Sequence, residues 1–433
     1  MTQRISRRDM LRNTTMAGLG AWVSGVTSAS FGSLPSEKLN IACIGIGGRG
    51  RANLNALGNQ NIVALCDVDD SRAGNAYAKF AKAKKFYDFR RMFDAMPKDI
   101  DAVSVSTPDH AHFHPAIAAL QLGKHLYCEK PMAHSIEEVR IMTDLARKQK
   151  VATQLGVQRH TIGNVHRVIE LIQKKAIGEV RECHSWVGGS RGMPGMPKGT
   201  PPVPDHLKWD LWLGPARSRP YSPAYAPYNW RFWWDFGTGE TGNWGCHILD
   251  LPYWALDLKY PTRVEASGPK VDADRTPESL NTRFDFPARG DKPPVSLHWY
   301  HSGGGPDILK KHHLPRSGNT LFIGSKGMLL CDFGKRKLYP EEKFKGFKEP
   351  DMFIPNSPGF HKEWINACKG KGETLCNFDY SGALIENNLL GNLAHRAALG
   401  KELKWDAEKF EITNHAEANS LLSKTYRKGW EIS

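Results

Sequence analysis

The segment Ile41-Ala-Cys-Ile-Gly-Ile-Gly-Gly-Arg-Gly50 predicts an apolar strand that runs into a glycine-rich turn, and residues 48–57 then predict a helix. In a G-x-G-x-x-G turn the first glycine permits the tight bend, the second lets a pyrophosphate approach the backbone, and the third lets the helix pack on the strand. The helix N-terminus then faces the phosphates. We therefore predict a dinucleotide site that includes Gly45, Ile46, Gly47, Gly48, Arg49 and Gly50.

A carboxylate follows the next apolar run, Ile62-Val-Ala-Leu-Cys66. Asp67 lies 17 residues beyond Gly50, close to the separation of about 20 at which such a carboxylate binds the adenosine ribose. A carboxylate there accepts hydrogen bonds from the ribose hydroxyls and repels a 2′-phosphate, so NAD is favoured over NADP. Arg49 and Arg72 keep NADP open as an alternative.

Strand and helix patterns alternate through the first part of the chain. Strands are predicted at 39–46, 62–66, 85–87, 101–107, 125–128 and 151–155, with helices at 48–57, 115–122 and 136–148. This alternation predicts an α/β fold with a doubly wound parallel sheet, whose ligands bind beyond the carboxyl ends of the strands. Polar residues stand at three of these ends, and we expect them to meet the cofactor in one crevice: Thr107, Pro108, His110, His112, Glu129, Lys130 and Gln158.

The second part of the chain has a different pattern. Short β-rich runs occur at 183–187, 263–267, 282–286, 295–300 and 320–331, with helices near 247–256, 359–368 and 380–399. They predict an α+β domain with an open, mainly antiparallel sheet. The Pro/Gly-rich, aromatic stretch at 188–227 is expected to be an ordered loop over the site or a subunit contact.

The extreme N-terminus resembles a twin-arginine export signal. Ser6-Arg-Arg-Asp-Met-Leu-Arg12 precedes a mildly apolar stretch at 16–26 and small residues at 27–30. The apolar stretch is too short for a stable membrane anchor, so we expect cleavage between Ala29 and Leu34, passage through the twin-arginine translocase and a periplasmic or otherwise exported enzyme. The alternative is the basic N-terminus of a cytosolic enzyme. The predicted parts are a signal peptide at 1–33, an NAD-binding Rossmann domain at 34–158 and an α+β domain for substrate binding and oligomerisation at 159–433.

The formal net charge is +14, and residues 1–33 contribute four Arg and one Asp, which leaves +11 on the mature chain. That charge favours acidic partners or an anionic substrate. Nucleic-acid binding is not predicted, because the basic residues are scattered and form no stripe with interleaved aromatics. The eight Cys include no C-x-x-C pair and no zinc-like spacing, so we predict no metal and at most one disulfide.

Five segments together resemble the Gfo/Idh/MocA oxidoreductases, from about Lys38 to the end of the chain. They are the glycine loop, Thr107-Pro-Asp-His-Ala-His112, Cys128-Glu-Lys-Pro131, Trp209-Asp-Leu-Trp-Leu-Gly-Pro215 and Gly245-Cys-His-Ile-Leu-Asp250. The most specific is Glu-Lys-Pro at the end of the fifth strand. The resemblance implies a Rossmann domain, a second domain on an open antiparallel sheet, NAD(P)-linked chemistry on sugars or polyols, and a homodimer or homotetramer.

The resemblance also implies catalytic roles. Lys130 would contact the nicotinamide ribose and the reacting hydroxyl, where an ammonium stabilises a developing alkoxide. His247 matches the family's general acid/base, since imidazole titrates near neutral pH. Many relatives carry Asp four residues before this His, but here the position is Asn243, which holds a hydroxyl but cannot accept a proton. Asp250 either hydrogen-bonds His247 or caps the local backbone.

Aromatic segments predict a platform for a sugar ring. Asn229-Trp-Arg-Phe-Trp-Trp-Asp235 precedes the His247 helix, and His298-Trp-Tyr-His301 lies on a later predicted strand. Flat rings stack on the apolar faces of pyranoses, while polar neighbours bind hydroxyls. The predicted substrate residues are Arg231, Trp234, Asp235 and Tyr300. Core packing is the alternative for the tryptophans.

Two classes of enzyme fit these residues. In the first, an exported dehydrogenase oxidises a ring hydroxyl of a sugar, polyol or glycoside, with NAD taking the hydride and His247 the proton. A tightly bound NAD would then need a second substrate to reoxidise it. In the second, an NAD-dependent glycosidase oxidises a ring carbon transiently, eliminates the glycosidic oxygen, adds water and reduces the ring again. A third hypothesis, an NAD-binding sensor, fits less well because Lys130 and His247 are both present.

Overall fold

A parallel sheet forms the first part of the described chain. The computed structural model describes residues 38–189, 191–302 and 306–431, and the chain from Lys38 onward is one compact unit. The predicted export signal lies outside these residues. Within them the first sheet has six strands in the order β3-β2-β1-β4-β5-β6, which is the order of a dinucleotide-binding sheet. The strands are β1 (Asn40–Ile44), β2 (Asn61–Cys66), β3 (Lys84–Phe86), β4 (Ala102–Val105), β5 (His125–Cys128) and β6 (Thr153–Leu155).

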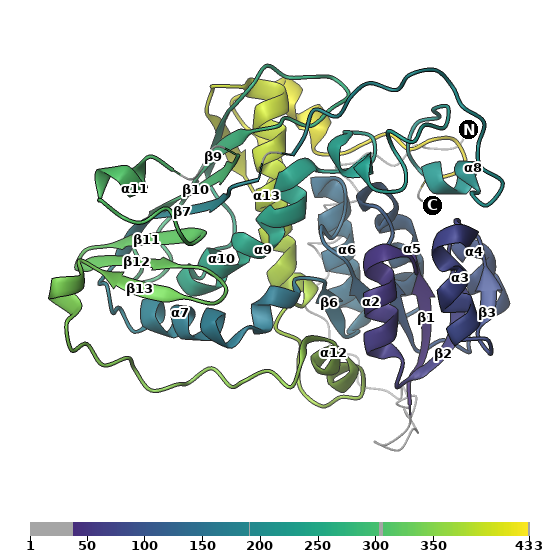
Figure 1. Cartoon of the computed structure of the whole chain (residues 1–433), viewed down its shortest axis with the longest axis horizontal. Coiled ribbons are helices and arrows are strands. Elements are labelled where there is room, and N and C mark those ends of the chain that lie inside the picture. The colour runs from purple at the N-terminus through teal and green to yellow at the C-terminus, as the bar shows by residue number, and fades with distance from the viewer. Residues whose placement is uncertain (1–37, 190, 303–305, 432–433) are drawn as a thin grey trace, which may run out of the picture. The chain divides into compact units, whose positions relative to one another are not determined.

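Helices connect these parallel strands and lie against the sheet (Figure 1). They are α2 (Gly48–Leu57), α3 (Asp70–Lys79), α4 (Phe89–Ala95), α5 (Phe113–Gln121) and α6 (Ile136–Gln149). Helix α2 has the predicted bounds. Helix α6 begins at a capping box, in which the Ser135 hydroxyl and the Glu138 carboxylate each accept from the other's backbone N–H. The predicted doubly wound fold is confirmed.

The second sheet is mainly antiparallel, as predicted. Its nine described strands follow the order β13-β12-β11-β7-β10-β9-β8-β14-β15, and β7 pairs with β10 in parallel. The strands are β7 (Val180–Val187), β8 (Arg263–Ser267), β9 (Leu280–Phe286), β10 (Val295–His301), β11 (Thr320–Gly324), β12 (Gly327–Cys331), β13 (Arg336–Tyr339), β14 (Leu403–Asp406) and β15 (Glu411–Ile412). The β-rich run predicted at 320–331 is a hairpin of β11 and β12.

The helix predicted at 247–256 is longer and interrupted. A π-turn, η4 (Thr241–Gly245), precedes α9 (Cys246–Ile248) and α10 (Asp250–Leu256). Such π-turns are frequent at functional sites, and this one carries Asn243. The other elements are α7 (Gly163–Gln173), α8 (Trp209–Leu213), α11 (Ile308–Lys311), α12 (Phe360–Cys368), α13 (Phe378–Ala398), η1 (Asp109–Ala111), η2 (Gln158–Thr161), η3 (Asn229–Phe232), η5 (Glu341–Phe344) and η6 (Ala416–Leu421).

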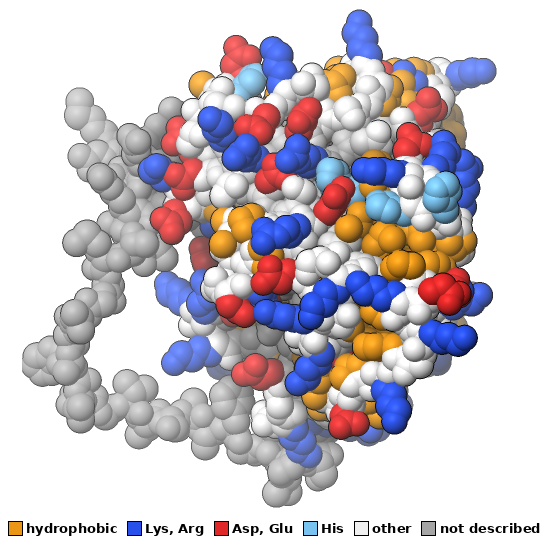
Figure 2. Space-filling view, turned by 90° about the vertical axis from the view of Figure 1, so that its left-hand side faces the viewer, with side chains coloured by type: hydrophobic (Ala, Val, Ile, Leu, Met, Phe, Trp, Pro, Cys, Tyr) orange, Lys and Arg blue, Asp and Glu red, His pale blue; other side chains and the backbone are white. Residues whose placement is uncertain are grey.

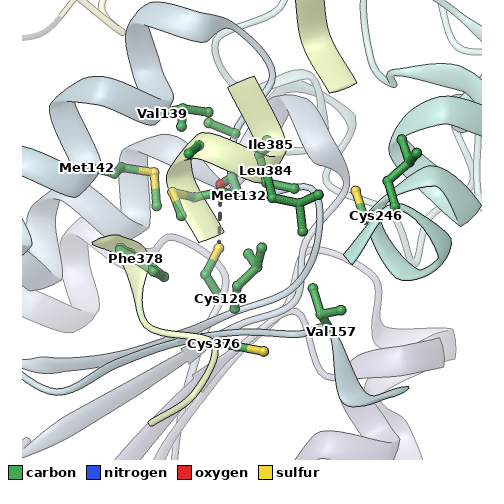
Figure 3. Packing of buried hydrophobic residues seen from close by; sticks show 14 of the residues in the cluster. Cys128, Met132, Val139, Met142, Val157, Cys246, Cys376, Phe378, Leu384 and Ile385 are labelled. Carbon is green, nitrogen blue, oxygen red and sulfur yellow. Dashed lines mark hydrogen bonds between the residues drawn. The ribbon is translucent and has the colours of Figure 1, made fainter. Parts of the chain in front are cut away.

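Helix α13 packs against a helix that lies on the first sheet and against a strand of the second sheet. It is buried along most of its length and contacts α6 on one side and β8 on the other. Figure 3 shows Phe378 and Leu384 of this helix beside Cys128, the last residue of β5. The Cys128 thiol donates to the Met132 carbonyl oxygen at 3.6 Å. Because Lys130 lies between Cys128 and Met132, this core fixes the backbone on both sides of it.

The eight cysteines all lie in the described part of the chain, and no disulfide joins them there. Seven are buried and Cys368 is half-buried. Among the described residues, no helix is both long and apolar enough to cross a membrane. Figure 2 shows one face of the molecule, on which hydrophobic side chains gather among lysines and arginines.

Two glycines in neighbouring helices provide a matched test of the glycine turn. A Cβ on Gly50 would lie 1.8 Å from the Gly45 carbonyl oxygen, whereas a Cβ on Gly74 in α3 meets nothing within 4 Å. We expect Gly50→Ala to lower the free energy of unfolding by about 1–3 kcal/mol and to weaken NAD binding. Gly74→Ala should raise the free energy of unfolding by about 0.5–1 kcal/mol. Urea denaturation and NAD titration of both variants check this, and equal effects would contradict it.

Candidate functional site

A cavity of about 680 Å³ lies beyond the carboxyl ends of the parallel strands. Its wall includes Gly45 after β1, Asp67 after β2, Thr107 after β4, Lys130 after β5 and Gln158 after β6. This volume is in the range of ligand sites, about 300–1,000 Å³. The three polar strand ends therefore meet in one crevice, where the sequence placed them.

The glycine loop is shaped for close approach. Gly45 has φ +75°, and a Cβ there would lie 2.7 Å from the backbone of Ser106. A Cβ on Gly50 would lie even closer, 1.8 Å from the Gly45 carbonyl oxygen, so neither position has room for a side chain. The N-terminus of α2 has no side-chain cap, which leaves its N–H groups for an anion. The loop thus fits the pyrophosphate of a dinucleotide.

Asp67 lines the cavity but also holds the glycine loop. Its Oδ2 accepts from the N–H of Ile46 at 2.7 Å and of Gly47 at 3.2 Å. Burial raises the pKa of Asp67, and these backbone hydrogen bonds oppose the rise. A Cβ on Gly48 would lie 2.7 Å from Nη2 of Arg72, so a guanidinium stands over the loop. Ribose binding by Asp67 stays a prediction, and Arg72 keeps NADP open.

Glu129 connects the glycine loop to two strand ends. Its Oε1 accepts from Asn53 Nδ2 at 2.9 Å, Gln158 Nε2 at 2.7 Å, Tyr127 Oη at 3.2 Å and Arg49 Nε at 3.3 Å. These donors come from α2, β5 and the turn after β6. Both Glu129 and Gln158 line the cavity, and their contacts set the relative positions of its walls.

Lys130 is held by the π-turn of the second part of the chain. Its Nζ donates to the backbone oxygen of Asn243 at 2.8 Å and to the side-chain Oδ1 at 2.9 Å. Two of the three ammonium protons are thereby used, which leaves one for a ligand in the cavity. Burial lowers the pKa of Lys130. The predicted Lys130 and Asn243 are therefore direct partners.

A buried carboxylate that the sequence analysis missed lies behind Asn243. Glu240 accepts from Asn243 Nδ2 at 3.3 Å and pairs with Arg191 at 2.6 Å. Burial raises the pKa of Glu240, and Arg191 opposes the rise. Arg191 belongs to the stretch at 188–227 and lines the cavity. The sequence does place Glu240 three residues before Asn243, the position at which this chain differs from the family pattern.

His247 lines the same cavity and is half-buried. Burial lowers its pKa well below the usual value, and the charges of Lys130, Arg159 and Arg49 lower it further. The imidazole is therefore neutral at pH 7. Its Nδ1 is buried without a hydrogen-bond partner among the described residues, which leaves Nε2 as the nitrogen available to a ligand. A neutral imidazole there can accept a proton from a hydroxyl.

Asp109 is a second carboxylate that the sequence analysis did not select, although it lies inside the quoted Thr107–His112 motif. It lines the cavity, and its Oδ2 accepts from the hydroxyl and the N–H of Thr238 at 2.7 and 3.1 Å. Burial raises the pKa of Asp109, while His112, Thr238 and Lys130 lower it. It can accept a hydrogen bond from a ligand or balance the charge of Lys130.

Several predicted cofactor residues support the cavity from behind. The side chain of Ile46 is fully buried, and Gly50 packs against the loop. The ring nitrogens of His112 lie 2.7 and 2.8 Å from the carbonyl oxygens of Pro131 and Thr107. His110 likewise contacts two backbone carbonyls, at 3.0 and 3.2 Å. None of these four residues is among the described residues of the cavity wall.

Asp250 is not placed beside His247. Its carboxylate lies 2.9 Å from Nδ1 of His160 and accepts from the Tyr380 hydroxyl at 2.7 Å. It is 1% exposed. Of the two roles predicted for Asp250, the hydrogen bond to His247 is not formed, because the helix turns the carboxylate toward His160 of η2 and Tyr380 of α13.

Of the four predicted substrate residues, Arg231 alone lines the cavity in the described structure. Its guanidinium lies over the rings of Trp230 and Tyr228, at 4.2 and 4.5 Å. Asp235 forms ion pairs with two arginines outside the cavity. Trp234 is 8% exposed and donates to a backbone carbonyl at 3.1 Å.

Tyr300 needs a clear correction. It lies on β10 of the second sheet, where its hydroxyl is 3.0 Å from Nδ1 of His184. Strand alternation puts Tyr300 on the half-buried face of the sheet, opposite the core-facing Trp299. The structure therefore does not place Tyr300 in the cavity.

The covering stretch, residues 188–227, contributes to the cavity wall, and two polar clusters lie outside that wall. Residues of the 188–227 stretch, among them Arg191, Leu211, Trp212 and Pro227, line the cavity, which agrees with a loop over the site. Among the described residues, two groups could offer metal ligands: His160, Asp250 and Cys376, and Glu182, His184 and His298. Neither group lines the cavity, so neither would place a metal beside Lys130.

Two family models match the chain. An oxidoreductase family model described as an NAD-binding Rossmann fold matches residues 39–157, and that family's C-terminal alpha/beta domain model matches 183–285. Together they span 222 of the 433 residues.

Curated relatives match over part of their length. A glycosyl hydrolase family 109 protein of Solibacter usitatus is 33% identical over 174 residues, which are 36% of this chain and 38% of the relative. The glucose-6-phosphate 3-dehydrogenase of Bacillus subtilis is 32% identical over 225 residues, 51% of this chain and 55% of the relative. The chain thus spans less than two thirds of either relative.

A solved structure shares the fold. The WlbA dehydrogenase from Bordetella pertussis, in complex with NADH and UDP-GlcNAcA, has a TM-score of 0.60 at 17% sequence identity. The match covers 86% of this chain and 99% of the other.

The Glu240–Arg191 pair predicts a measurable coupling between the π-turn and the covering stretch. We expect Glu240→Gln to lower the free energy of unfolding by about 1–3 kcal/mol, because it leaves a charged partner without its counter-ion. Hydrogen exchange in residues 191–200 should become faster. Arg191→Met and the double variant close a double-mutant cycle. Additive effects of the two single substitutions would show that the pair does not couple these segments.

Proposed function

Because the chain belongs to the Gfo/Idh/MocA oxidoreductase family, we propose that it is an NAD-dependent enzyme that transfers a hydride at a ring hydroxyl of a sugar, polyol or glycoside. The observation that carries the proposal is that Lys130 and His247 line the same cavity as the glycine loop. The names of the relatives, which include a sugar-phosphate dehydrogenase, support a carbohydrate substrate.

The residues divide the chemistry between them. NAD bound on the glycine loop would supply the hydride acceptor. The free ammonium N–H of Lys130 donates a hydrogen bond to the oxygen of the reacting hydroxyl and stabilises the alkoxide that develops there. The neutral imidazole of His247 accepts the hydroxyl proton. Asn243 keeps Lys130 in place, and Asp109 balances its charge.

A redox-neutral glycosidase is the second candidate function. The relative named as a glycosyl hydrolase family 109 protein supports it. In that reaction the oxidised ring carbon acidifies the neighbouring C–H, a base removes that proton, the glycosidic oxygen leaves, water adds and the hydride returns. The same Lys130 and His247 would serve the first step, so the two candidates differ in cofactor turnover.

Export and assembly belong to the same proposal. The N-terminal sequence supports passage through the twin-arginine translocase, which carries folded proteins and would allow NAD to be bound tightly before export. Half-buried apolar side chains of the second sheet, such as Tyr300, Ile323 and Met328, support a homodimer or homotetramer. The hydrophobic patch in Figure 2 is consistent with such a contact.

Mass spectrometry of the nucleotide released from denatured mature protein, followed by assays with free sugars and aryl glycosides, tests the proposed function. We expect bound NAD and stoichiometric reduction of NAD by free sugars. Aryl-glycoside cleavage at catalytic NAD levels would identify the glycosidase instead. Absence of NAD binding would refute both candidates.

Lys130→Met tests whether the Lys130 ammonium takes part in turnover. Methionine keeps the length of the side chain but cannot donate to an alkoxide, so turnover should fall by about 10²–10³-fold while NAD stays bound. Unchanged turnover would remove Lys130 from the mechanism.

The lowered pKa of His247 predicts the pH at which kcat/KM for sugar oxidation begins to fall on the acid side of its pH profile. The imidazole must be neutral to accept a proton, and its folded pKa lies well below 6.5. We therefore expect kcat/KM for oxidation to stay flat from pH 8 to pH 6.5 and to fall only at lower pH. A limb at or above pH 6.5 that persists in His247→Asn would assign the titration to another residue.

A further inference from the structure

We propose that the substrate is an anionic sugar, one that carries a carboxylate or a phosphate, and that Arg159 binds this anionic group. The inference rests on the proposed function and specifies the substrate class of the same site.

Arg159 is held flat in the cavity wall by two aromatic rings. It lies in η2 directly after β6, and its guanidinium carbon is 4.4 Å from the Phe333 ring centre and 5.0 Å from that of Trp244. Phe333 follows β12 and Trp244 belongs to the π-turn, so separate elements hold the group. Rings on the faces of a guanidinium leave its N–H edge for acceptors in the plane.

The Arg159 side chain has no counter-ion in the protein. Among the described residues, no carboxylate or other acceptor hydrogen-bonds its guanidinium, which lies against the two rings instead. Arg191 pairs with Glu240 and Arg49 with Glu129, and Arg231 donates to the backbone oxygen of Tyr228. Arg72, which also has no ion pair among the described residues, lies over the glycine loop. A half-buried cation without a partner raises the free energy of the site, and a ligand anion would lower it.

The position of Arg159 separates it from the cofactor phosphates. The glycine loop follows β1, whereas Arg159 follows β6, and β4 and β5 lie between them in the sheet. Lys130 follows β5, so Arg159 lies beyond the reacting hydroxyl as seen from the phosphates. The Arg159 guanidinium and the His247 ring both lie against Trp244, with the guanidinium carbon 5.0 Å and the imidazole centre 6.0 Å from a Trp244 ring centre, so Arg159 is on the His247 side of the cavity. An anion bound there belongs to the substrate.

The surrounding charges favour the same ligand. Arg191 and Arg231 also line the cavity with Lys130 and Arg159. Asp109 and Glu129 both act on Lys130, Asp109 also acts on Arg231, and Glu240 pairs with Arg191. These carboxylates offset Lys130, Arg191 and Arg231, and no carboxylate pairs with Arg159 among the described residues, so an anion is favoured at Arg159.

A bound anion would also assist the proton transfer. Neutralising Arg159 removes one of the charges that disfavour imidazolium at His247, so the imidazole becomes a better proton acceptor in the complex. A neutral sugar leaves the guanidinium charge in place. We therefore expect an anionic sugar to have a higher kcat than a neutral sugar, as well as tighter binding.

Matched sugars test the proposal in the wild-type protein with NAD bound. The pairs are glucose against glucuronate, galactose against galacturonate, and each neutral hexose against its 6-phosphate, measured by titration calorimetry and by NAD reduction. We expect one anionic class to exceed its neutral partner by about 10–100-fold in kcat/KM, which corresponds to about 1.4–2.8 kcal/mol. The carboxylate and phosphate arms identify which anion the site takes.

Arg159→Met should abolish this preference and leave NAD affinity unchanged. Arg181→Met is the control, because Arg181 is an exposed side chain on β7 that pairs with Glu179; it should keep the preference. In the wild type, anionic substrate should shift the acid limb of kcat upward relative to neutral substrate.

The outcomes separate this inference from the proposed function. Equal oxidation of neutral and anionic sugars, or a preference that survives Arg159→Met, overturns the inference and leaves the oxidoreductase standing. A loss of NAD affinity in Arg159→Met with an unchanged ratio of substrates assigns Arg159 to the cofactor and also overturns it. If no sugar of either kind binds or reduces NAD, both proposals fail. The comparison of wild-type substrates remains decisive even if the variant does not fold.

Discussion

The carboxylate of Glu129 is the interaction on which the arrangement of the site depends. One of its oxygens accepts from four donors that come from the glycine loop, α2, β5 and the turn after β6. Gly156 must remain glycine beside it, because a Cβ would lie 2.6 Å from the carboxyl carbon. Four donors compensate the cost of burying the charge. The phosphate loop, Lys130 and Arg159 thereby share one fixed frame.

Asn243 and Glu240 form a matched pair at the other wall. The amide presents its oxygen to the Lys130 ammonium and its nitrogen to the Glu240 carboxylate, so both partners require the same orientation of the amide. An Asp at 243 would suit Lys130 but would face Glu240 with a like charge. The family resemblance implies Asp at 243, whereas this chain has a carboxylate three residues earlier, Glu240, which pairs with Arg191 of the covering stretch. The neutral Asn243 is thus accompanied by a carboxylate, Glu240, in the same helix.

Residues whose role follows from local spacing could be predicted from the sequence. The glycine turn, the strand ends and Lys130 depend on chain order within one sheet, and the structure brings them together. Asp109 and Arg191 were missed because their partners Thr238 and Glu240 lie far away in sequence. Glu240 was missed although it lies three residues before Asn243, because its role depends on the distant Arg191. Tyr300 was misplaced because a strand pattern gives the alternation of faces but not which face meets the cavity. Asp250 shows the same limit for a helix.

Only the structure shows where the positive charges of the chain lie and which of them are paired. Composition gives +14 but does not separate solvated lysines from cations that need a ligand. In the cavity, Arg49 and Arg191 have carboxylate partners and Arg231 donates to a backbone oxygen, whereas Arg159 has two aromatic rings and no hydrogen-bond acceptor among the described residues. Packing a guanidinium between rings costs desolvation that an exposed lysine avoids. A site that retains such a cation beside its proton acceptor is arranged for a ligand that brings the missing negative charge.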